Sequence, residues 1–495
     1  MPLSFTPERL LELLSLLLEE PPADSSFDRG HKFPFAVSEM LSASAPEMLD
    51  LVLSDSACVE RLFAYMNTPV ENRTLLGYFA GLILALLGRN ANVGYQLVFA
   101  WNKFPMAALK NMHSKSIAEL VFRLLFLDTT VSAHFLLERF AMLKELVGLL
   151  GPASTSEEHS NSSGVLCDLI HQMEAKSWKL LICWLIQRPQ LESLFGNVLC
   201  GVESAAAGSL AVLNALLSCD CLCELADINL DKVIRVIQWS ESTGQGEEPS
   251  EQDTEPEDAL IPLLLEHLPS VLKLLEGQNP SVGAVRLQVV ELVDIMLRQK
   301  SPVFESLITQ ESGLRRAVSF FFAYPLNSIL HRSVEGLVHT VLEKGSESLQ
   351  KHLVEELELP VLLASTAKAS KGTPGNSGCG HMGHITRISN YLKGQSLPWW
   401  QPGEVWQEFD STYLAVVNNL EKMPKKEVDP EPEFDIERDM PTGEEEISLS
   451  AIVDPTSQPA SAPVTETEDA GDSEGFGTWE FWKVPLSTGK LEDLD

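Results

Sequence analysis

The sequence has few basic residues and no apolar run long enough to cross a membrane. Lysine and arginine number 36 against 70 aspartates and glutamates, which gives the 495-residue chain a formal net charge of −34. This charge disfavours nucleic acid as a partner, because the phosphates would be repelled. The longest apolar stretch, residues 75–88, falls short of the roughly 18 to 20 residues that span a bilayer, so it predicts a buried helix and no membrane insertion.

Cysteine is also sparse. The eight cysteines lie mostly inside apolar segments and lack the dense, regular spacing of a disulfide framework. The apolar run at residues 10–18 contains Glu12 and is followed by acidic residues and prolines rather than by a small-residue cleavage site. We therefore expect no secretory signal, and reduced thiols in a cytoplasmic protein that can also be nuclear.

Motifs for catalysis and for metal binding are missing or incomplete. The sequence has no phosphate-binding glycine-rich loop, no dinucleotide fingerprint, no nucleophile elbow and no His-Glu-x-x-His pair. Cysteines at residues 219–223, and Cys379 with His381 and His384, are zinc ligands by type, but neither set has the spacing of a four-ligand site. We interpret them as buried cysteines and as a turn entering a helix. We expect no enzyme, no cofactor and no catalytic or metal-binding residue.

Acidic and turn-forming residues are concentrated in a few segments. Residues 427–495 hold 20 acidic residues against three basic ones and are rich in Pro, Ser, Thr and Gly. Such a segment buries too little apolar surface to offset chain entropy, so residues 426–495 are predicted to form a disordered acidic tail. Residues 241–258 hold eight acidic residues and no basic one, which predicts an acidic mobile loop. Flexible loops are predicted at residues 151–164 and 369–380.

Helical periodicity runs through the segments between these loops. Apolar residues recur at the spacing of one helix face in the stripe Ile117, Leu120, Val121, Leu124 and Leu125 and in the stripe Leu330, Val334, Leu337, Val338 and Val341. A capping box is predicted at residues 116–119. Strict period-two alternation is absent. The pattern predicts an all-α fold, a HEAT/armadillo-like helical-repeat solenoid over residues 1–425; periodicity alone also allows a large multi-domain helical bundle.

Short motifs recur in a fixed order along the chain. The first are Glu-Glu-Pro-Pro at residues 19–22 and a basic-aromatic-Pro-Phe string leading into a helix at residues 32–41. The motifs that follow lie at residues 116–125, 161–170, 286–292, 321–331, 380–390 and 406–409. Together they resemble the SAPS-domain regulatory subunits of protein phosphatase 6, the Sit-type phosphatase-associated proteins. The segment at residues 380–390, Gly-His-Met-Gly-His-Ile-Thr-Arg-Ile-Ser-Asn, is similar to one block of that family.

The resemblance implies a non-catalytic scaffold. Its expected partners are a serine/threonine phosphatase catalytic subunit and a third, substrate-recruiting subunit, with no nucleic acid and no membrane insertion. The metal-binding motifs of a metallophosphatase are absent from the sequence, in agreement with a regulatory role. Composition and periodicity alone allow a second function, a generic helical-repeat adaptor for trafficking or transport.

Polar residues within the apolar-rich motifs are the candidate partner-binding residues. The eight candidates are Arg29, Lys32, Glu39, Arg123, Arg286, His331, His384 and Arg387. Each is either buried in a satisfied network or exposed to a partner, and the sequence leaves both interpretations open. Around the first two, we expect Phe33, Pro34, Phe35 and Val37 to pack as a rigid entry into a helix.

The predicted tail carries one aromatic motif. It consists of Phe476, Trp479, Phe481 and Trp482, in a segment otherwise built from acidic and small residues. Aromatic side chains dominate small interfaces, so the motif predicts docking onto another subunit or a substrate. Folding back onto an apolar groove of the solenoid is the alternative.

Overall fold

The structure, a computed structural model, is helical throughout the part that it describes. The described residues are 6–43, 46–67, 69–89, 104–126, 134–171, 176–219, 230, 235, 259–276, 281–370 and 380–421, and they contain no strand. They lie in a first unit, Met1–Met423. Within these ranges no helix is both long and apolar enough to cross a membrane.

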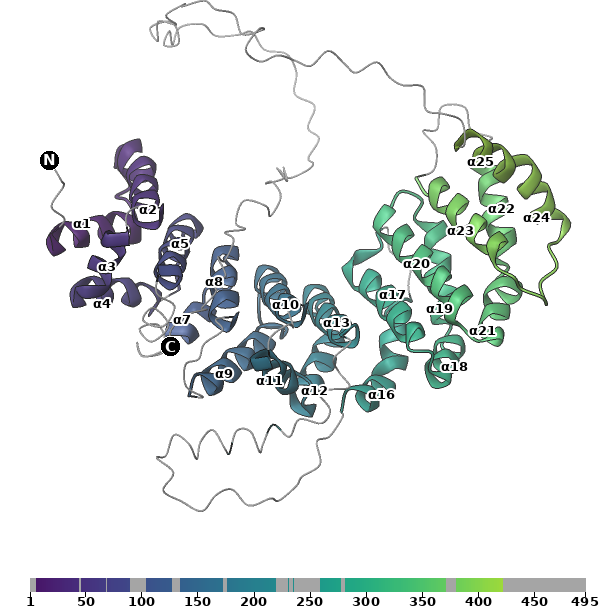
Figure 1. Ribbon diagram of the computed structural model, residues 1–495, viewed down its shortest axis with the longest axis horizontal. Helices are drawn as coiled ribbons and strands as arrows, with labels where there is room; N and C mark the ends of the chain where they lie inside the picture. Colours follow the sequence, from purple (N-terminus) through teal and green to yellow (C-terminus); the bar gives the residue numbers. More distant parts are fainter. Residues whose placement is uncertain are drawn as a thin grey trace, which may run out of the picture. The chain divides into compact units, whose positions relative to one another are not determined.

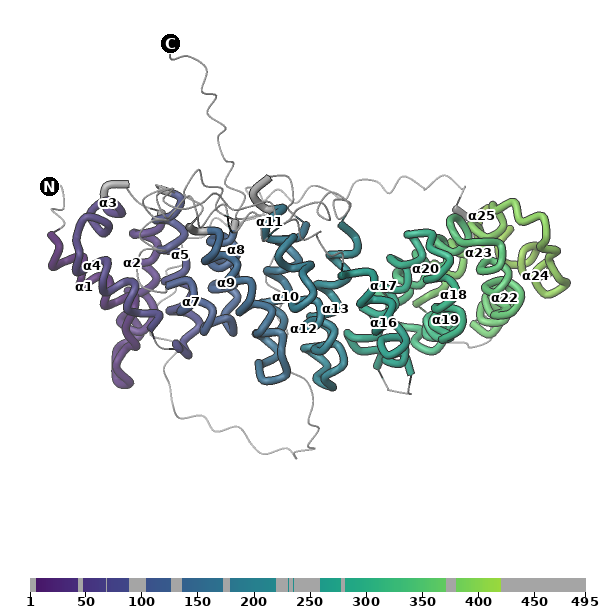
Figure 2. Tube along the Cα trace, turned by 90° about the horizontal axis from the view of Figure 1, so that it is seen from below, coloured from purple at the N-terminus to yellow at the C-terminus, as the bar shows by residue number. Residues whose placement is uncertain are grey.

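One row of helices runs along the whole described part of the first unit (Figures 1 and 2). Each of its helices packs against the next in the row. In chain order the row consists of α2 (Phe33–Ala43), α5 (Arg73–Arg89), α8 (Lys115–Phe126), α10 (Ser156–His171), α13 (Glu203–Leu217), α17 (Gly283–Arg298), α20 (Ser328–Lys344) and α23 (Met382–Gly394).

The other helices pack beside this row. Of these, α7, α9, α12, α16 and α18 contact one another in that order and so form a second row. The helices outside the first row are α1 (Pro7–Leu18), α3 (Pro46–Ser54), α4 (Ser56–Ala64), α7 (Phe104–Leu109), α9 (His134–Leu149), α11 (Lys176–Leu185), α12 (Arg188–Val198), α16 (Leu260–Lys273), α18 (Pro302–Gln310), α19 (Gly313–Ala323), α21 (Glu347–Lys351), α22 (Leu359–Ser370), α24 (Glu404–Phe409) and α25 (Ala415–Glu421).

This arrangement confirms the predicted all-α helical-repeat solenoid. Helices that neighbour each other in sequence pair across the two rows, as α7 with α8, α12 with α13 and α17 with α18, and each pair stacks on the next. Every residue of the two predicted apolar stripes is buried. Because each pair can bury its apolar face only against its neighbours, the core is one continuous cluster along the stack.

The predicted loop at residues 151–164 is wrong for its second half, because α10 begins at Ser156. Thr155 and Glu158 form a capping box: each backbone N–H donates to the other's side chain, at 2.8 and 3.3 Å. The polar residues that suggested a loop have partners inside the fold. The His159 Nε2–H donates to the Gly151 carbonyl at 2.8 Å, and the Asn161 amide donates to the Met112 carbonyl at 2.7 Å. These bonds let a polar segment form a helix with one buried face, which includes His159, Ser162 and Ser163.

Smaller differences concern two other helices. Helix α8 begins at Lys115, so Ser116 lies inside it, and Glu119 accepts a hydrogen bond from Arg123 instead of closing the predicted capping box. Helix α22 extends to Ser370 and so includes the start of the second predicted flexible loop. Residues 371–379, the acidic loop at 241–258 and the tail at 426–495 lie outside the described residues, so these predictions remain untested.

Candidate functional site

Three of the predicted residues, His331, His384 and Arg387, lie near Glu335 where α20 packs against α23. The Arg387 guanidinium donates two hydrogen bonds to the Glu335 carboxylate, from Nε to Oε1 at 2.7 Å and from Nη2 to Oε2 at 2.8 Å. His384, one turn before Arg387 on α23, donates from Nδ1 to the same carboxylate. We call Glu335, His384 and Arg387 the Glu335 clamp. It ties two consecutive helices of the first row together.

His331 lies one turn before Glu335 on α20 and is fully buried. Its Nε2–H donates to the Tyr324 carbonyl at 2.9 Å. Its ring contacts Phe321, with centroids 5.0 Å apart, and lies 5.2 Å from the His381 ring. Burial lowers the pKa of His331, and the neighbouring His381 and His384 lower it further, although the bond to the Tyr324 carbonyl acts in the opposite direction. The neutral imidazole is therefore favoured.

Electrostatics hold the Glu335 carboxylate in its charged form. Its side chain is only 13% exposed, and this burial raises its pKa. Hydrogen bonds from Arg387 and His384 outweigh the burial, so the net pKa lies below its ordinary value. The Glu335 carboxylate thus accepts hydrogen bonds from both other members of the clamp. Within the described ranges no group of three or more His, Cys, Asp or Glu side chains is placed to hold a metal ion.

The first two predicted residues lie in a surface segment that we call the N-terminal basic-aromatic segment, residues 27–35. A π-helical turn, Asp28–Lys32, leads directly into α2. Lys32 is ion-paired with Asp28 at 2.8 Å, and its Nζ lies 5.8 Å from the centre of the Phe27 ring. Such contacts between exposed groups are weak, so they leave the lysine available to a partner.

The phenylalanines of this segment differ from the prediction. Pro34 and Val37 are buried, as expected of a rigid helix entry. Phe33 and Phe35 are instead 48% and 55% exposed, and Phe27 is 67% exposed. Phe33 and Phe35 do not reach the core, because the buried positions of α2 occupy only one side of the helix. Three exposed large aromatics beside basic residues therefore form an unusual patch.

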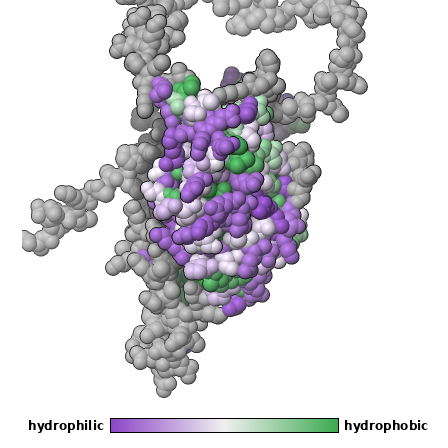
Figure 3. Space-filling view, turned by 90° about the vertical axis from the view of Figure 1, so that its right-hand side faces the viewer, coloured by the Kyte–Doolittle hydropathy of each residue, from purple (hydrophilic) through white to green (hydrophobic). Residues whose placement is uncertain are grey.

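The opposite end of the described chain offers a contrast. Figure 3 faces the end that carries α24 and α25, and the residues coloured there are mostly hydrophilic, with hydrophobic ones in small separate patches. Large apolar residues exposed on these helices include Val405 and Val416. Isolated residues of this kind are ordinary on a soluble surface.

The remaining predicted residues do not join either group. Glu39 is exposed on α2, and Arg123 forms an exposed pair with Glu119 one turn away. Arg286 is buried: its Nη2 donates to the Glu276 carbonyl at 2.9 Å, and its guanidinium lies 5.4 Å from the centre of the Phe320 ring. Arg286 thus has a structural role. The tail motif, Phe476, Trp479, Phe481 and Trp482, lies outside the described residues.

Sequence reasoning missed Glu335, although a signal was present. Glu335 follows His331 by four residues, so a helix places both on one face. It also missed Gly208, where α10 and α13 approach closely. A Cβ at this position would lie 3.3 Å from Ser163 Cβ and 3.3 Å from a Leu150 methyl group. That distance depends on how two helices dock, and no local sequence pattern predicts it.

Known proteins resemble this chain both in the region of the Glu335 clamp and along most of its length. The family model described as SAPS, SIT4 phosphatase-associated protein, matches residues 306–396, which include the Glu335 clamp. The chain is 24% identical over 424 residues to serine/threonine-protein phosphatase 6 regulatory subunit 3-A of Xenopus laevis, covering 78% of this chain and 49% of the relative.

Two human proteins are similar to the same extent. Serine/threonine-protein phosphatase 6 regulatory subunit 1 is 24% identical over 476 residues, covering 83% of this chain and 53% of the relative. Regulatory subunit 2 is 23% identical over 435 residues, covering 77% and 44%. The chain thus spans about half the length of the curated relatives it matches. The resemblance predicted from the sequence motifs is confirmed.

Proposed function

We propose that this chain, which carries a SAPS segment and resembles phosphatase 6 regulatory subunits along most of its length, is itself a non-catalytic regulatory subunit. In this proposal it binds the catalytic subunit of a protein phosphatase 6-type serine/threonine phosphatase and directs its substrate choice or assembly. The observation that carries the proposal is the extent of the similarity, which covers 78% of the chain rather than one motif. An extended helical array suits this role, because it offers a long surface for other proteins.

The chemistry of the Glu335 clamp and of His331 supports a scaffold rather than an enzyme. In the Glu335 clamp the carboxylate is occupied by Arg387 and His384, so it is not available as a general base. His331 has its Nε2 bonded to a backbone carbonyl and is fully buried, so substrate cannot reach it. These groups stabilise the helix stack that a partner would contact.

The N-terminal basic-aromatic segment is the surface that we assign to the catalytic subunit. Exposed Phe27, Phe33 and Phe35 can supply the apolar anchors that carry most of the energy of an interface. Arg29 and Lys32 add positive charge in a chain whose net charge is −34, so they can select an acidic patch on the partner.

A binding experiment with purified proteins tests both parts of this proposal. The chain is immobilised and titrated with the phosphatase 6 catalytic subunit, alongside the double variant Arg29→Glu/Lys32→Glu. We expect about tenfold or greater loss of affinity in the variant, with an unchanged melting temperature because both residues are partly exposed. A matched control, Lys273→Glu/Arg315→Glu, makes the same charge change at exposed positions on α16 and α19.

The possible outcomes distinguish an error in the proposed function from an error in the proposed binding surface. If the unaltered chain does not bind the catalytic subunit, the proposed function is wrong. If the double variant binds as tightly as the control variant, the function stands but the surface is wrong. If the double variant unfolds, Arg29 and Lys32 are structural residues instead.

Two further parts of the proposal concern the cellular setting. We propose that a third, substrate-recruiting subunit joins the assembly, since most of a long helical surface stays free when one partner binds. A cytoplasmic and nuclear location is supported by Cys58, Cys167 and Cys200, which are free thiols in the described part of the chain. Co-purification from cells followed by identification of the bound proteins tests the first point, and imaging of the tagged full chain tests the second.

A further inference from the structure

Two parts of the chain contain no acidic residue, although aspartate and glutamate make up 70 of its 495 residues. They are residues 312–334, which include three arginines, and residues 359–403, which include Arg387 and three lysines. Their described helical residues belong to α19, to the first two turns of α20, and to α22 and α23. Because α20 packs against both α19 and α23 (Figure 1), the two parts meet beside the N-terminal half of α20.

Two large apolar side chains point into solvent at this end of α20. Leu326 is 83% exposed and Ile329 is 68% exposed, the highest values among the large apolar residues that the structure describes. Leu326 lies in the turn before α20 and Ile329 in its first turn. A Cβ on Gly380 would lie 3.9 Å from a Leu326 methyl group, so this turn lies beside the start of α23. A contiguous apolar pair gains free energy only when a partner covers it.

Two arginines beside this pair have donor groups to spare. Arg332 follows Ile329 by three residues, so both lie on one face of α20; it is exposed and has no hydrogen bond or ion pair with another described residue. Arg387 is held by Glu335, one turn after Arg332, through its Nε and Nη2. Its Nη1 has no partner among the described residues, and the side chain is 57% exposed. Both arginines can therefore donate to a carboxylate of a partner without giving up a bond.

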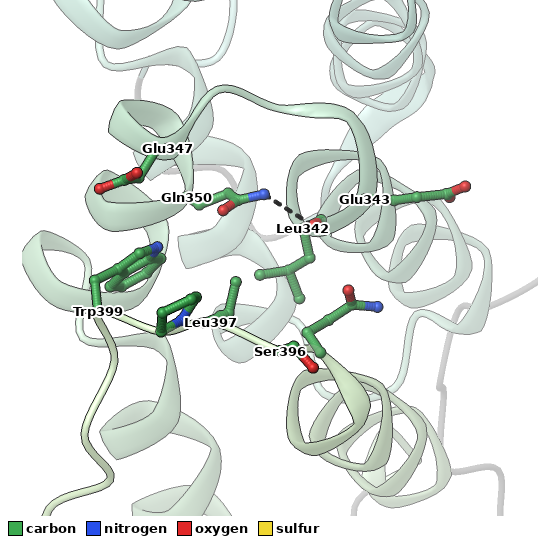
Figure 4. A pocket seen from close by; sticks show the side chains of 9 residues that line it. Leu342, Glu343, Glu347, Gln350, Ser396, Leu397 and Trp399 are labelled. Atoms are coloured by element: carbon green, nitrogen blue, oxygen red, sulfur yellow. Dashed lines mark hydrogen bonds between the residues drawn. The ribbon is translucent and has the colours of Figure 1, made fainter.

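The C-terminal end of α20 carries the opposite charge. Figure 4 shows a pocket there, with Glu343 of α20 and Glu347 of α21 among its lining residues. The Glu343 carboxylate points away from the pocket. The surplus of positive charge is therefore confined to the N-terminal half of the helix, where it can distinguish an acidic partner segment from a basic one.

The net charge of −34 does not prevent an acidic segment from binding here. At physiological ionic strength, exposed charges separated by more than about 8 Å are largely screened from each other. A partner at this surface therefore responds mainly to the nearby arginines. The apolar pair favours a protein over nucleic acid, because single-stranded nucleic acid is held by aromatic side chains on which its bases stack, and neither Leu326 nor Ile329 is aromatic.

We propose that Leu326, Ile329, Arg332 and Arg387 form a docking surface for a short segment of a partner protein in which apolar side chains alternate with aspartates or glutamates. The apolar side chains cover Leu326 and Ile329, and the carboxylates pair with Arg332 and with Nη1 of Arg387. We call these four residues the α20 docking surface. It shares no residue with the N-terminal basic-aromatic segment, and it does not rest on the proposed function, because it requires no phosphatase.

Ligand-detected saturation-transfer NMR on the full chain tests this surface, since the method detects weak binding. The probe is the capped peptide Gly-Glu-Leu-Glu-Glu-Leu-Glu-Gly. One comparison peptide carries glutamine in place of every glutamate, and another carries serine in place of both leucines. We expect the probe to bind more tightly than either comparison peptide, because only the probe offers both carboxylates and apolar side chains.

Two variants of the chain locate the binding. Arg332→Gln and Ile329→Ser should each raise the dissociation constant of the probe about two- to fivefold, since each removes one exposed contact. Matched controls are Lys273→Gln on α16 and Val303→Ser on α18, which make the same kinds of change at exposed positions outside the α20 docking surface. Both controls should leave the dissociation constant unchanged. Melting temperatures show whether each variant is folded.

Three results would overturn the proposal. The first is equal binding of the probe and both comparison peptides. The second is equal binding of the probe by Arg332→Gln and Lys273→Gln; this pair decides alone if Ile329→Ser lowers the melting temperature. The third comes from an oligothymidylate of the same length as the probe. If it binds more tightly than the probe and loses affinity in Arg332→Gln, the surface recognises nucleic acid instead of an acidic protein segment.

Discussion

Arg387 on α23 forms a two-pronged salt bridge with Glu335 on α20, with N···O distances of 2.7 and 2.8 Å. Glu335 is 13% exposed, whereas Arg387 is 57% exposed. The pair therefore lies at the edge of the contact between two helices of the first row. Its strength comes from geometry, because a bidentate arginine–carboxylate pair is stronger than a single exposed ion pair.

Removing the carboxylate should loosen this contact. We expect Glu335→Ala to lower the free energy of unfolding by about 1.5 to 3 kcal/mol, the cost of losing charged hydrogen bonds. Urea denaturation followed by circular dichroism measures the change. Arg332→Gln, at an exposed position on the same helix, is the control and should change stability by less than about 0.5 kcal/mol. Equal stability of the two variants would show that the clamp does not hold the helices together.

Stability should fall as the pH is lowered below about 6.5. Burial lowers the pKa values of His331 and His339 from 6.5 in the folded chain. At such a pH these two histidines bind protons more readily in the unfolded chain than in the folded chain, so acid favours unfolding. The lowered pKa of Glu335 acts only as the pH falls below about 4.5.

The variant His331→Leu removes one of these two groups. Between about pH 7.5 and about pH 5.5 it should lose less stability than the unaltered chain, whatever its stability at neutral pH. Urea midpoints at the two pH values give the comparison. An identical pH dependence in both proteins would contradict the assignment to His331.

Two glycines of the packed α10 and α13 pair should respond in opposite directions. At Gly208 the neighbours are already 3.3 Å from an added Cβ, so Gly208→Leu should cost about 1 to 3 kcal/mol through overpacking. At Gly164 no atom lies within 4 Å, so Gly164→Ala should stabilise α10 by about 0.5 to 1 kcal/mol. Thermal unfolding measures both changes. If both substitutions destabilise equally, the close approach at Gly208 is not the cause.

Three cysteines should be unreactive in the folded chain. Burial raises the pKa of Cys58 to about 11, that of Cys167 to about 12 and that of Cys183 to about 11. The thiolate is the reactive form, so iodoacetamide at about pH 8 should modify these thiols slowly. Mass spectrometry of digested protein measures the modification, and the urea-unfolded chain is the positive control. Rapid labelling of folded protein at these sites would indicate local opening.

Local sequence determined the secondary structure and the fold class. The apolar stripe from Ile117 to Leu125 recurs at helical spacing, and burial of that face is the way such a helix gains stability in water. The same physics explains why α5 could be predicted from one apolar run. The ordered motifs also sufficed to indicate the family, because they need only to be compared with known sequences and not to be placed in space.

Only the tertiary structure decided what the polar residues do. His384 and Arg387 became clamp residues because α23 docks on α20, which brings them to a glutamate about 50 positions earlier in the chain. Residues 156–164 look like a loop by composition but form a helix, since Gly151 and Met112 supply their partners. Phe33 and Phe35 look like core residues but face solvent, because α2 packs against the rest of the fold through its other side. The role of a polar or aromatic side chain depends on the group that it contacts. In this fold that group often belongs to a residue far away in the sequence, so only the tertiary structure reveals it.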